Sequence, residues 1–173
     1  MKTLKKKNLL SVSLIAIAMV FAVASSEDDS PPASMTDAEL NKPIKTEKFE
    51  VTFTSHQTRQ KVGGEFISTK AAEGATYVIV SYKYKNITKK PMGMFDLPDL
   101  YLYSAEGTKY DEDLDASSSF ASESDDDEKV FSDLNPGIST SSSKVFEVSK
   151  ELFEKGGWYV VFEGDDNLKL QIN

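Results

Sequence analysis

The segment from Tyr77 to Asn86 restricts the fold of this chain more than any other, because its hydropathy alternates residue by residue. Side chains of a β-strand point alternately to the two sides of a sheet. One face is apolar and aromatic throughout and carries Val78, Val80, Tyr82 and Tyr84. The other face begins with Tyr77 and Ile79 and becomes polar at Ser81 and Lys83. This pattern predicts a strand of a β-sandwich.

Further period-two segments, separated by turn residues, extend this pattern to a small all-β domain. Phe49, Val51 and Phe53 alternate with polar residues, as in a strand with one buried face. The turn Asn135-Pro136-Gly137 has proline at its second position, where φ is fixed, and glycine at its third, where φ can be positive. Additional strands are predicted over 58–62, 100–103, 108–110, 143–148, 157–163 and 168–172, with a short extended piece around 66–68 and a renewed strand pattern over 129–134.

At most one or two short helices are expected between these strands. The segment from Ser149 to Glu154 is typical of a short helix, with Ser149 as N-cap and Gly156 as its stop. Residues 111–128 are acidic and serine-rich and predict a long surface loop that can contain a short helix. Eight or nine short strands with so little helix favour an all-β, immunoglobulin-like antiparallel β-sandwich. We expect the following residues to be largely buried in it: Val78, Val80, Tyr82, Phe146, Val148, Val160 and Phe162.

The N-terminal region predicts a secreted or cell-surface protein. Four lysines precede an apolar run from Leu9 to Ala24, which ends in Ala22-Val23-Ala24. This order is typical of a cleaved secretory signal peptide. An uncleaved membrane anchor is the alternative, but the run of 16 residues is shorter than the roughly 20 that a spanning helix needs. We therefore predict a signal peptide over 1–24, a flexible polar linker over 25–44 with at most one helical turn, and a β-sandwich domain over 45–173.

The charge and the absence of cysteine exclude several classes of partner and site. Removal of the leader would take away four lysines and no acid, which changes the net charge from −8 to −12. Nucleic acid is not expected as a partner, because phosphate backbones are bound through Lys and Arg. Anionic lipid is disfavoured for the same reason, so the membrane is expected to be contacted only through the leader before cleavage. A chain without cysteine also has no thiol catalysis, thiolate metal site or disulfide.

Several motifs resemble the telokin-like extracellular domain in their order and spacing. They are Gly74-x-x-Tyr77-Val78-Ile79-Val80 leading to Lys85-Asn86, Phe95-x-Leu97, Gly107-x-x-Tyr110, Leu134-Asn135-Pro136-Gly137 and Lys144-Val145-Phe146-Glu147-Val148. This family of unknown function occurs in exported proteins and lipoproteins, mainly of Gram-positive bacteria, and is related in fold to the mycobacterial immunoprotective extracellular antigen. The resemblance covers about residues 45–172. It implies an immunoglobulin-like β-sandwich and no catalytic residues.

Two features depart from that family pattern. Many relatives carry a lipid-attachment cysteine after the leader, whereas Ser25 follows Ala24 here. The departure favours release from the cell, or attachment to the envelope by other means. The acidic loop 111–128 is also longer and more charged than in a minimal member.

His56 is the only histidine, and it offers little support for an enzyme. A serine hydrolase needs a nucleophile, a base and an orienting acid in contact, but the chain has no Gly-x-Ser-x-Gly motif. One histidine without cysteine also excludes zinc sites built from nitrogen and sulfur ligands. We expect His56 to be a polar residue near a strand end and the protein not to be an enzyme.

The acidic loop is the candidate metal site. Asp111, Asp113 and Asp115 repeat at the spacing of the first half of a calcium loop, but Ala116 and Ser122 stand where an EF-hand needs Gly and Glu. A looser site would draw its oxygen ligands from the candidates Asp111, Asp113, Asp115, Asp125, Asp126 and Asp127. The alternative is a solvated acidic loop. No cofactor is expected, and calcium is left open.

The aromatic residues are the candidate binding residues. Two Tyr-x-Tyr pairs each place both rings on one face of a strand. A face for sugar or peptide would draw on Tyr82, Tyr84, Tyr101, Tyr103, Tyr110, Trp158 and Tyr159, but packing in the core is the favoured role.

Three functions are compatible with these residues. The leading hypothesis is a non-enzymatic binding module that recognises an unidentified protein or envelope component. The alternatives are a structural accessory or spacer domain of the envelope, and a calcium-dependent binding protein or hydrolase.

Overall fold

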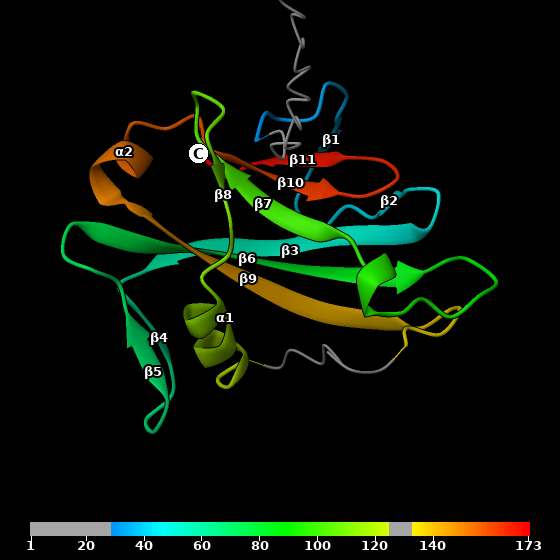
Figure 1. The fold of residues 1–173 in the computed structure, drawn as a ribbon, viewed down its shortest axis with the longest axis horizontal. Coiled ribbons are helices and arrows are strands. Elements are labelled where there is room, and N and C mark those ends of the chain that lie inside the picture. Colours follow the sequence, from blue (N-terminus) through cyan, green and yellow to red (C-terminus); the bar gives the residue numbers. More distant parts are fainter. Residues whose placement is uncertain (1–28, 125–132) are drawn as a thin grey trace, which may run out of the picture.

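The computed structural model describes residues 29–124 and 133–173. These residues contain eleven strands and three short helical segments. The predicted signal peptide over 1–24 lies outside these residues. The strands form two facing sheets and a separate small hairpin (Figure 1). The predicted all-β sandwich is confirmed.

The first sheet has five strands in the order β1-β11-β10-β7-β8. Their bounds are β1 Thr36–Ala38, β11 Leu168–Gln171, β10 Tyr159–Glu163, β7 Asp99–Tyr103 and β8 Lys109–Tyr110. All neighbours are antiparallel except β1 and β11, which run parallel.

The second sheet has four strands in the order β2-β3-β6-β9. Their bounds are β2 Ile44–Lys45, β3 Phe49–Arg59, β6 Ala75–Asn86 and β9 Ser139–Ser149. The three long strands pair antiparallel, and a bulge interrupts the β3–β6 register between Phe53 and Ser55.

A hairpin and three helical segments complete the fold. Strands β4 (Lys61–Gly63) and β5 (Ser68–Lys70) form a two-stranded sheet that projects from the sandwich (Figure 1). The helical segments are η1 (Met94–Asp96), α1 (Leu114–Ala121) and α2 (Lys150–Glu154). Within the described ranges, none of the helices has the length and apolar character required to cross a membrane.

The main core lies between the two sheets and contains the apolar face of β6. All seven residues expected to be buried have at most 3% of their surface exposed. A second, smaller core lies on the opposite face of β6, where Tyr77 and Ile79 pack beneath α1 and the hairpin. Both faces of the first half of β6 are therefore buried, and Tyr77 and Ile79 are buried in addition to the residues that we expected.

Local predictions about caps and turns agree with the structure. The Ser149 hydroxyl accepts a hydrogen bond from the N–H of Leu152 at the start of α2, and Gly156 follows its end with φ +82°. The N–H of Ile138 donates to the carbonyl of Asn135 at 3.1 Å, which closes a turn with Gly137 at φ +78°. This is the geometry of a type II turn.

Other expectations need correction. Thr36–Ala38, assigned to the linker, forms strand β1 instead of a helical turn, because its backbone bonds to β11. The described part of the chain alone contains eleven strands instead of eight or nine, and three of them have 11 or 12 residues. The strand expected over 58–62 is divided between β3 and β4. Most of the strand expected over 129–134 lies outside the described residues.

Asn86 joins the end of β6 to two loops. It is fully buried, and its side-chain amide donates to the carbonyls of Lys90 and Leu134, both at 2.8 Å. Its oxygen accepts from the N–H and the hydroxyl of Thr88, also at 2.8 Å. All four hydrogen-bonding positions of the amide are thus satisfied.

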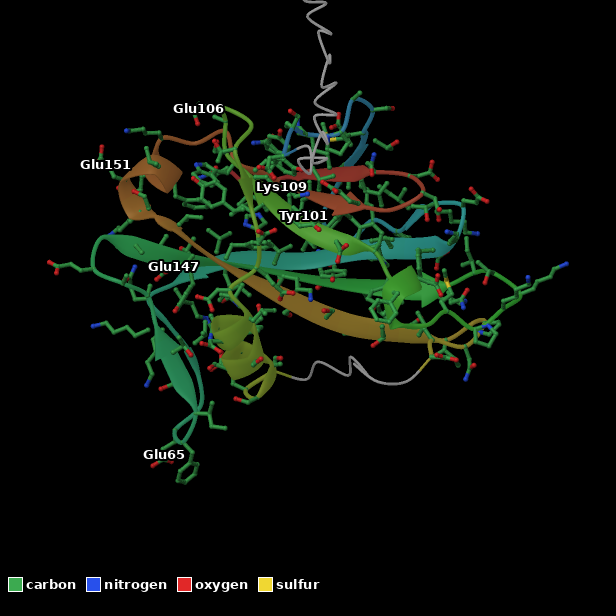
Figure 2. The ribbon with its side chains drawn as sticks, viewed as in Figure 1. Glu65, Tyr101, Glu106, Lys109, Glu147 and Glu151 are labelled. Atoms are coloured by element: carbon green, nitrogen blue, oxygen red, sulfur yellow. The ribbon has the colours of Figure 1, made fainter. Side chains whose placement is uncertain are left out.

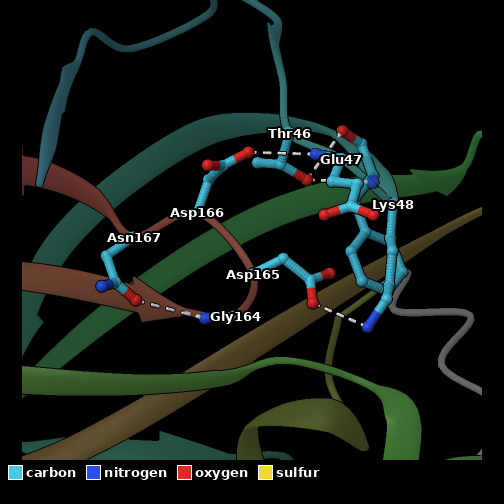
Figure 3. A network of polar contacts seen from close by, with 8 residues as sticks. Thr46, Glu47, Lys48, Gly164, Asp165, Asp166 and Asn167 are labelled. Atoms are coloured by element: carbon cyan, nitrogen blue, oxygen red, sulfur yellow. Dashed lines mark hydrogen bonds and ion pairs between the residues drawn. The ribbon is translucent and has the colours of Figure 1, made fainter.

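The β10–β11 loop holds the start of the domain (Figure 3). Asp165 forms an ion pair with Lys48 at 2.7 Å and raises the pKa of that lysine. Asp166 accepts from the N–H of Glu47 at 3.0 Å. The backbone carbonyl of Asn167 accepts a hydrogen bond from the N–H of Thr36. Its side-chain amide donates to the carbonyl of Ser34.

Candidate binding surfaces

The candidate aromatic residues are divided between the core and the surface. Tyr82, Tyr84, Tyr110 and Trp158 belong to, or pack against, the main core. Tyr101, Tyr103 and Tyr159 alternate in β7 and β10 with residues of that core, so they lie on the outer face of the five-stranded sheet. Tyr101 and Tyr159 are partly exposed, whereas Tyr103 lies on the same face but is fully buried, so two of the seven candidates contribute to an aromatic surface.

The outer-face tyrosines form a connected cluster with lysines and a glutamate, which we call the tyrosine face (Tyr101, Tyr103, Tyr159, Lys109, Lys169 and Glu163). The Tyr103 and Tyr159 rings stack with centroids 5.5 Å apart. The Tyr103 hydroxyl donates to Glu163 at 2.7 Å, and Lys109 Nζ lies 3.6 Å from the same carboxylate. Lys109 also lies 3.5 Å from the Tyr101 ring centroid (Figure 2).

Burial and negative charge raise the pKa values of these phenols above their ordinary range. Burial, followed by the charges of Asp99, Glu163 and Asp111, raises the pKa of Tyr101 to about 12. Burial and the hydrogen bond to Glu163 raise the pKa of Tyr103 further, and burial alone raises that of Tyr159. The phenols therefore stay neutral well into the alkaline range, and the faces of Tyr101 and Tyr159 attract lysines.

The tyrosine face is already largely occupied by its own side chains. Val161 points to this side of the sheet between Tyr101 and Lys169 but is fully buried. Lys169 lies 4.4 Å from the Tyr159 ring centroid, and Lys109 lies over the Tyr101 ring in the same way, at 3.5 Å. These cation–π contacts stabilise the surface, and a ligand that stacks on the same ring faces would have to displace the lysines.

A second candidate surface is the tip of the β4–β5 hairpin, which the sequence patterns did not identify. Phe66 is 95% exposed and Ile67 is 62% exposed. Figure 2 shows the adjacent Glu65 at the end of the hairpin, away from the sandwich. The signal in the sequence is Gly63-Gly64, where we expected a strand to end. The short strand that we predicted around 66–68 lies at Ser68–Lys70 instead, which leaves Phe66 and Ile67 in the turn.

The base of this hairpin is fixed to the domain, so the tip is held in place. Val62 and Ala71 are buried with Phe120 of α1 in the smaller core. The hydroxyls of Thr69 and Ser119 are 2.7 Å apart, which joins β5 to α1. Arg59 stacks on the Phe120 ring at 5.3 Å, where β3 ends. The two apolar side chains at the tip are thus presented on a supported element.

His56 lies within β3 and is half-buried opposite Val80, not at the strand end where we expected it. No hydroxyl or carboxylate of the described residues is hydrogen bonded to it. Within residues 29–124 and 133–173, no nucleophile, base and acid are in contact around this histidine.

The described acids of the candidate metal site serve the local fold. Asp113 caps α1 by accepting the N–H of Ala116 at 2.9 Å, and Asp115 lies in the first turn of that helix. Glu112 forms an ion pair with Lys144 at 2.7 Å. Among residues 29–124 and 133–173, no three side chains of the Asp, Glu, His or Cys type are grouped to hold a metal ion. The candidates Asp125, Asp126 and Asp127 lie outside these residues.

Similar proteins confirm the fold and identify the family. The model of DUF4352, a domain of unknown function, matches residues 38–153. Uncharacterized protein YxkC of Bacillus subtilis is 45% identical over 129 residues, which cover 74% of this chain and 72% of that protein. The crystal structure of a conserved hypothetical protein from Bacillus anthracis has a TM-score of 0.68 at 33% identity, and the match covers 78% of this chain and 94% of that one.

A more distant structure supports the fold alone. An uncharacterized β-sandwich protein from Clostridium difficile has a TM-score of 0.57 at 14% identity, and the match covers 85% of this chain and all of that one. The model match spans more than half of the chain and runs from β1 to α2. This chain therefore belongs to the DUF4352 family.

Proposed function

We propose that this chain is a non-enzymatic binding module, secreted or displayed at the cell surface, that recognises a protein component of the envelope. We further propose that it is a telokin-like extracellular domain. The motifs that carry this resemblance include the Asn135-Pro136-Gly137 turn and the strand after it, and the leader-like N-terminus supports export.

The exposed tip of the β4–β5 hairpin is the observation that carries the binding function. Phe66 and Ile67 contribute little to folding, because most of their surface stays in contact with water. The surrounding hairpin is nevertheless anchored through α1, which reduces the entropy lost when a partner binds. Large aromatic side chains that enter a partner's pocket commonly supply most of the binding energy of an interface.

The test compares two variants of equally exposed phenylalanines. Phe66→Ser removes the proposed contact, whereas Phe95→Ser removes a phenylalanine that is 94% exposed on η1. Each immobilised chain is incubated with envelope extract, and captured proteins are quantified by mass spectrometry with calcium or with a chelator. We expect a protein captured by the wild type to be reduced at least tenfold by Phe66→Ser and unchanged by Phe95→Ser.

Three results would contradict the proposal. Equal capture by both variants would exclude the hairpin tip as the contact. No enrichment over an unrelated acidic domain would favour a spacer. Capture lost in chelator would favour the calcium-dependent alternative.

A further inference from the structure

Strand β3 is paired with β6 along its length, but its other edge is paired only near its beginning. β2 pairs with Glu50 and Val51, and the N–H of Asn41 donates to the carbonyl of Phe53 at 2.8 Å. Beyond Phe53, no strand of the described residues pairs with this edge. Figure 1 shows β2 beside only one end of β3. We call residues 54–59 on this side the open β3 edge.

The contacts of β9 identify which backbone groups of its neighbour point toward β3. The N–H of Val145 donates to the Ser117 hydroxyl at 3.0 Å, and its carbonyl accepts from the N–H of Asp113 at 2.8 Å. Both groups of Val145 therefore point away from β6. Because the direction alternates along a strand, Lys144 exchanges its hydrogen bonds with its partner Val80.

The same alternation continues across β6 into β3. The N–H and carbonyl of Val80 point toward β9, so those of Ile79, the residue before it, point toward β3. Ile79 therefore exchanges hydrogen bonds with its partner Gln57. The N–H and carbonyl groups of His56 and Thr58 consequently point outward from the open β3 edge. Four backbone groups with strand spacing are available there, and their natural complement is another extended chain.

The composition of the open β3 edge suits a second copy of the same chain. Thr54-Ser55-His56-Gln57-Thr58 contains no acid, lysine, proline or glycine. The chain has a net charge of −8, so two copies repel each other at most surfaces, and a segment without acids is where they can approach. The next residue, Arg59, has its guanidinium bound to Glu123 of its own chain.

The other sheet edges are less suited to this contact. β1, β2 and β8 have only two or three residues each, and short edge strands are a common protection against pairing. β9 is covered at Val145 by the start of α1.

We propose that two copies of this chain associate by antiparallel pairing of their open β3 edges around a two-fold axis at Gln57. His56 of one copy then lies opposite Thr58 of the other, and the two pairs exchange four backbone hydrogen bonds. The two four-stranded sheets become one continuous sheet of eight strands. Such an interface is isologous and closes at the dimer.

The absence of cysteine from this chain allows the register to be tested by disulfide trapping. At the axis, Gln57 would face its own copy in a non-hydrogen-bonded pair with Cα atoms about 4.5 Å apart, within the range that a disulfide spans. The two His56 residues would be diagonal neighbours, offset by two positions along the strands, with their Cα atoms about 7–8 Å apart. Lys83 is exposed on the central strand β6 and would be remote from the contact.

The experiment oxidises three single-cysteine variants of the chain, purified as cells produce it, at low micromolar concentration. We expect Gln57→Cys to form a covalent dimer at least tenfold faster than His56→Cys or Lys83→Cys. Sedimentation velocity of the cysteine-free chain should show a dimer at high concentration. Thr58→Pro should abolish it with the circular dichroism spectrum unchanged, because the N–H that it removes points outward.

Two results would overturn the proposal. The first is a cysteine-free chain that stays monomeric up to several hundred micromolar. The second is equal trapping of Gln57→Cys and His56→Cys, because it would show random collision or another register.

Discussion

Replacing Asn86 tests how far a single buried amide stabilises this fold. The amide makes four hydrogen bonds of 2.8 Å, and each is worth about 0.5–1.5 kcal/mol net. The carbonyl of Lys90 and the hydroxyl of Thr88 can turn to water because they are exposed, so the sum must be discounted. We expect Asn86→Ala to lower the free energy of unfolding by about 3 kcal/mol, from the lost bonds and the cavity.

Asn86→Asp separates the two halves of this network. The carboxylate still accepts from Thr88 but faces the carbonyl oxygens of Lys90 and Leu134, where the amide donated. At neutral pH we expect it to destabilise the domain at least as much as Asn86→Ala. The loss should shrink as the pH falls and the carboxyl gains a proton, since the protonated form donates one bond.

The assay is urea unfolding of the purified chain, followed by tryptophan fluorescence and far-UV circular dichroism. A loss of 3 kcal/mol corresponds to a fall in Tm of about 10 °C for a domain of this size. Thr88→Val is the control, because it removes one hydroxyl and should cost at most about 1 kcal/mol. A loss below about 1 kcal/mol in Asn86→Ala would refute the reasoning, as would a pH-independent effect of Asn86→Asp.

Three further predictions concern glycine, tyrosine and the acidic loop. Gly156→Ala should lower the free energy of unfolding by about 1 kcal/mol, because the backbone φ is positive there. Gly157→Ala should lower it clearly more, because the added Cβ would lie 2.7 Å from the Ala105 side chain. Equal Tm values of the two variants would contradict this prediction. The tyrosine contribution to the unfolding free energy should be complete at pH 8–9 and decrease above about pH 10, because the unfolded chain then loses tyrosine protons that the fold retains up to the raised pKa of about 12 at Tyr101. An unchanged alkaline slope in Tyr101→Phe would count against this prediction. Calcium should raise Tm no more than magnesium does. Asp113→Ala should lower Tm by the same amount in calcium and in chelator, because it removes the N-cap of α1. A calcium-specific rise in Tm that is lost in Asp126→Ala would show a metal site.

The predictable part of the fold is the part encoded by local alternation. Val78 and Val80 were placed in the core from their spacing alone, and both are fully buried. Ile79 was not recognised as equally buried, because its cover is α1, a helix within an acidic and serine-rich segment. The signals there were weak: an Asp113 cap and the pair Ala116 and Phe120, four residues apart on one helix face.

Strand β1 was missed for a different reason. Of its three residues only Ala38 is buried, and the strand is held by backbone hydrogen bonds to β11. Backbone pairing leaves no pattern in side-chain hydropathy, so Thr36–Ala38 looked like part of a polar linker.

The candidate surfaces show the same limit. In β7, Leu100 and Leu102 alternate with Tyr101 and Tyr103, and the leucines take the core side. That alternation could have assigned the tyrosines to the outer face, whereas nothing local separates an exposed Phe66 from a buried one.

The pairing of β1 with β11 has a consequence for how the domain forms during synthesis. The first strand of the five-stranded sheet is completed by its last strand, and the β10–β11 loop holds residues near both β1 and β2. During synthesis, β1 emerges long before β11, so this sheet edge can close only after β11 has been made. The large sequence separation of the two strands raises the contact order and slows folding. Closure of this sheet is thus a late event, after β11 has left the ribosome.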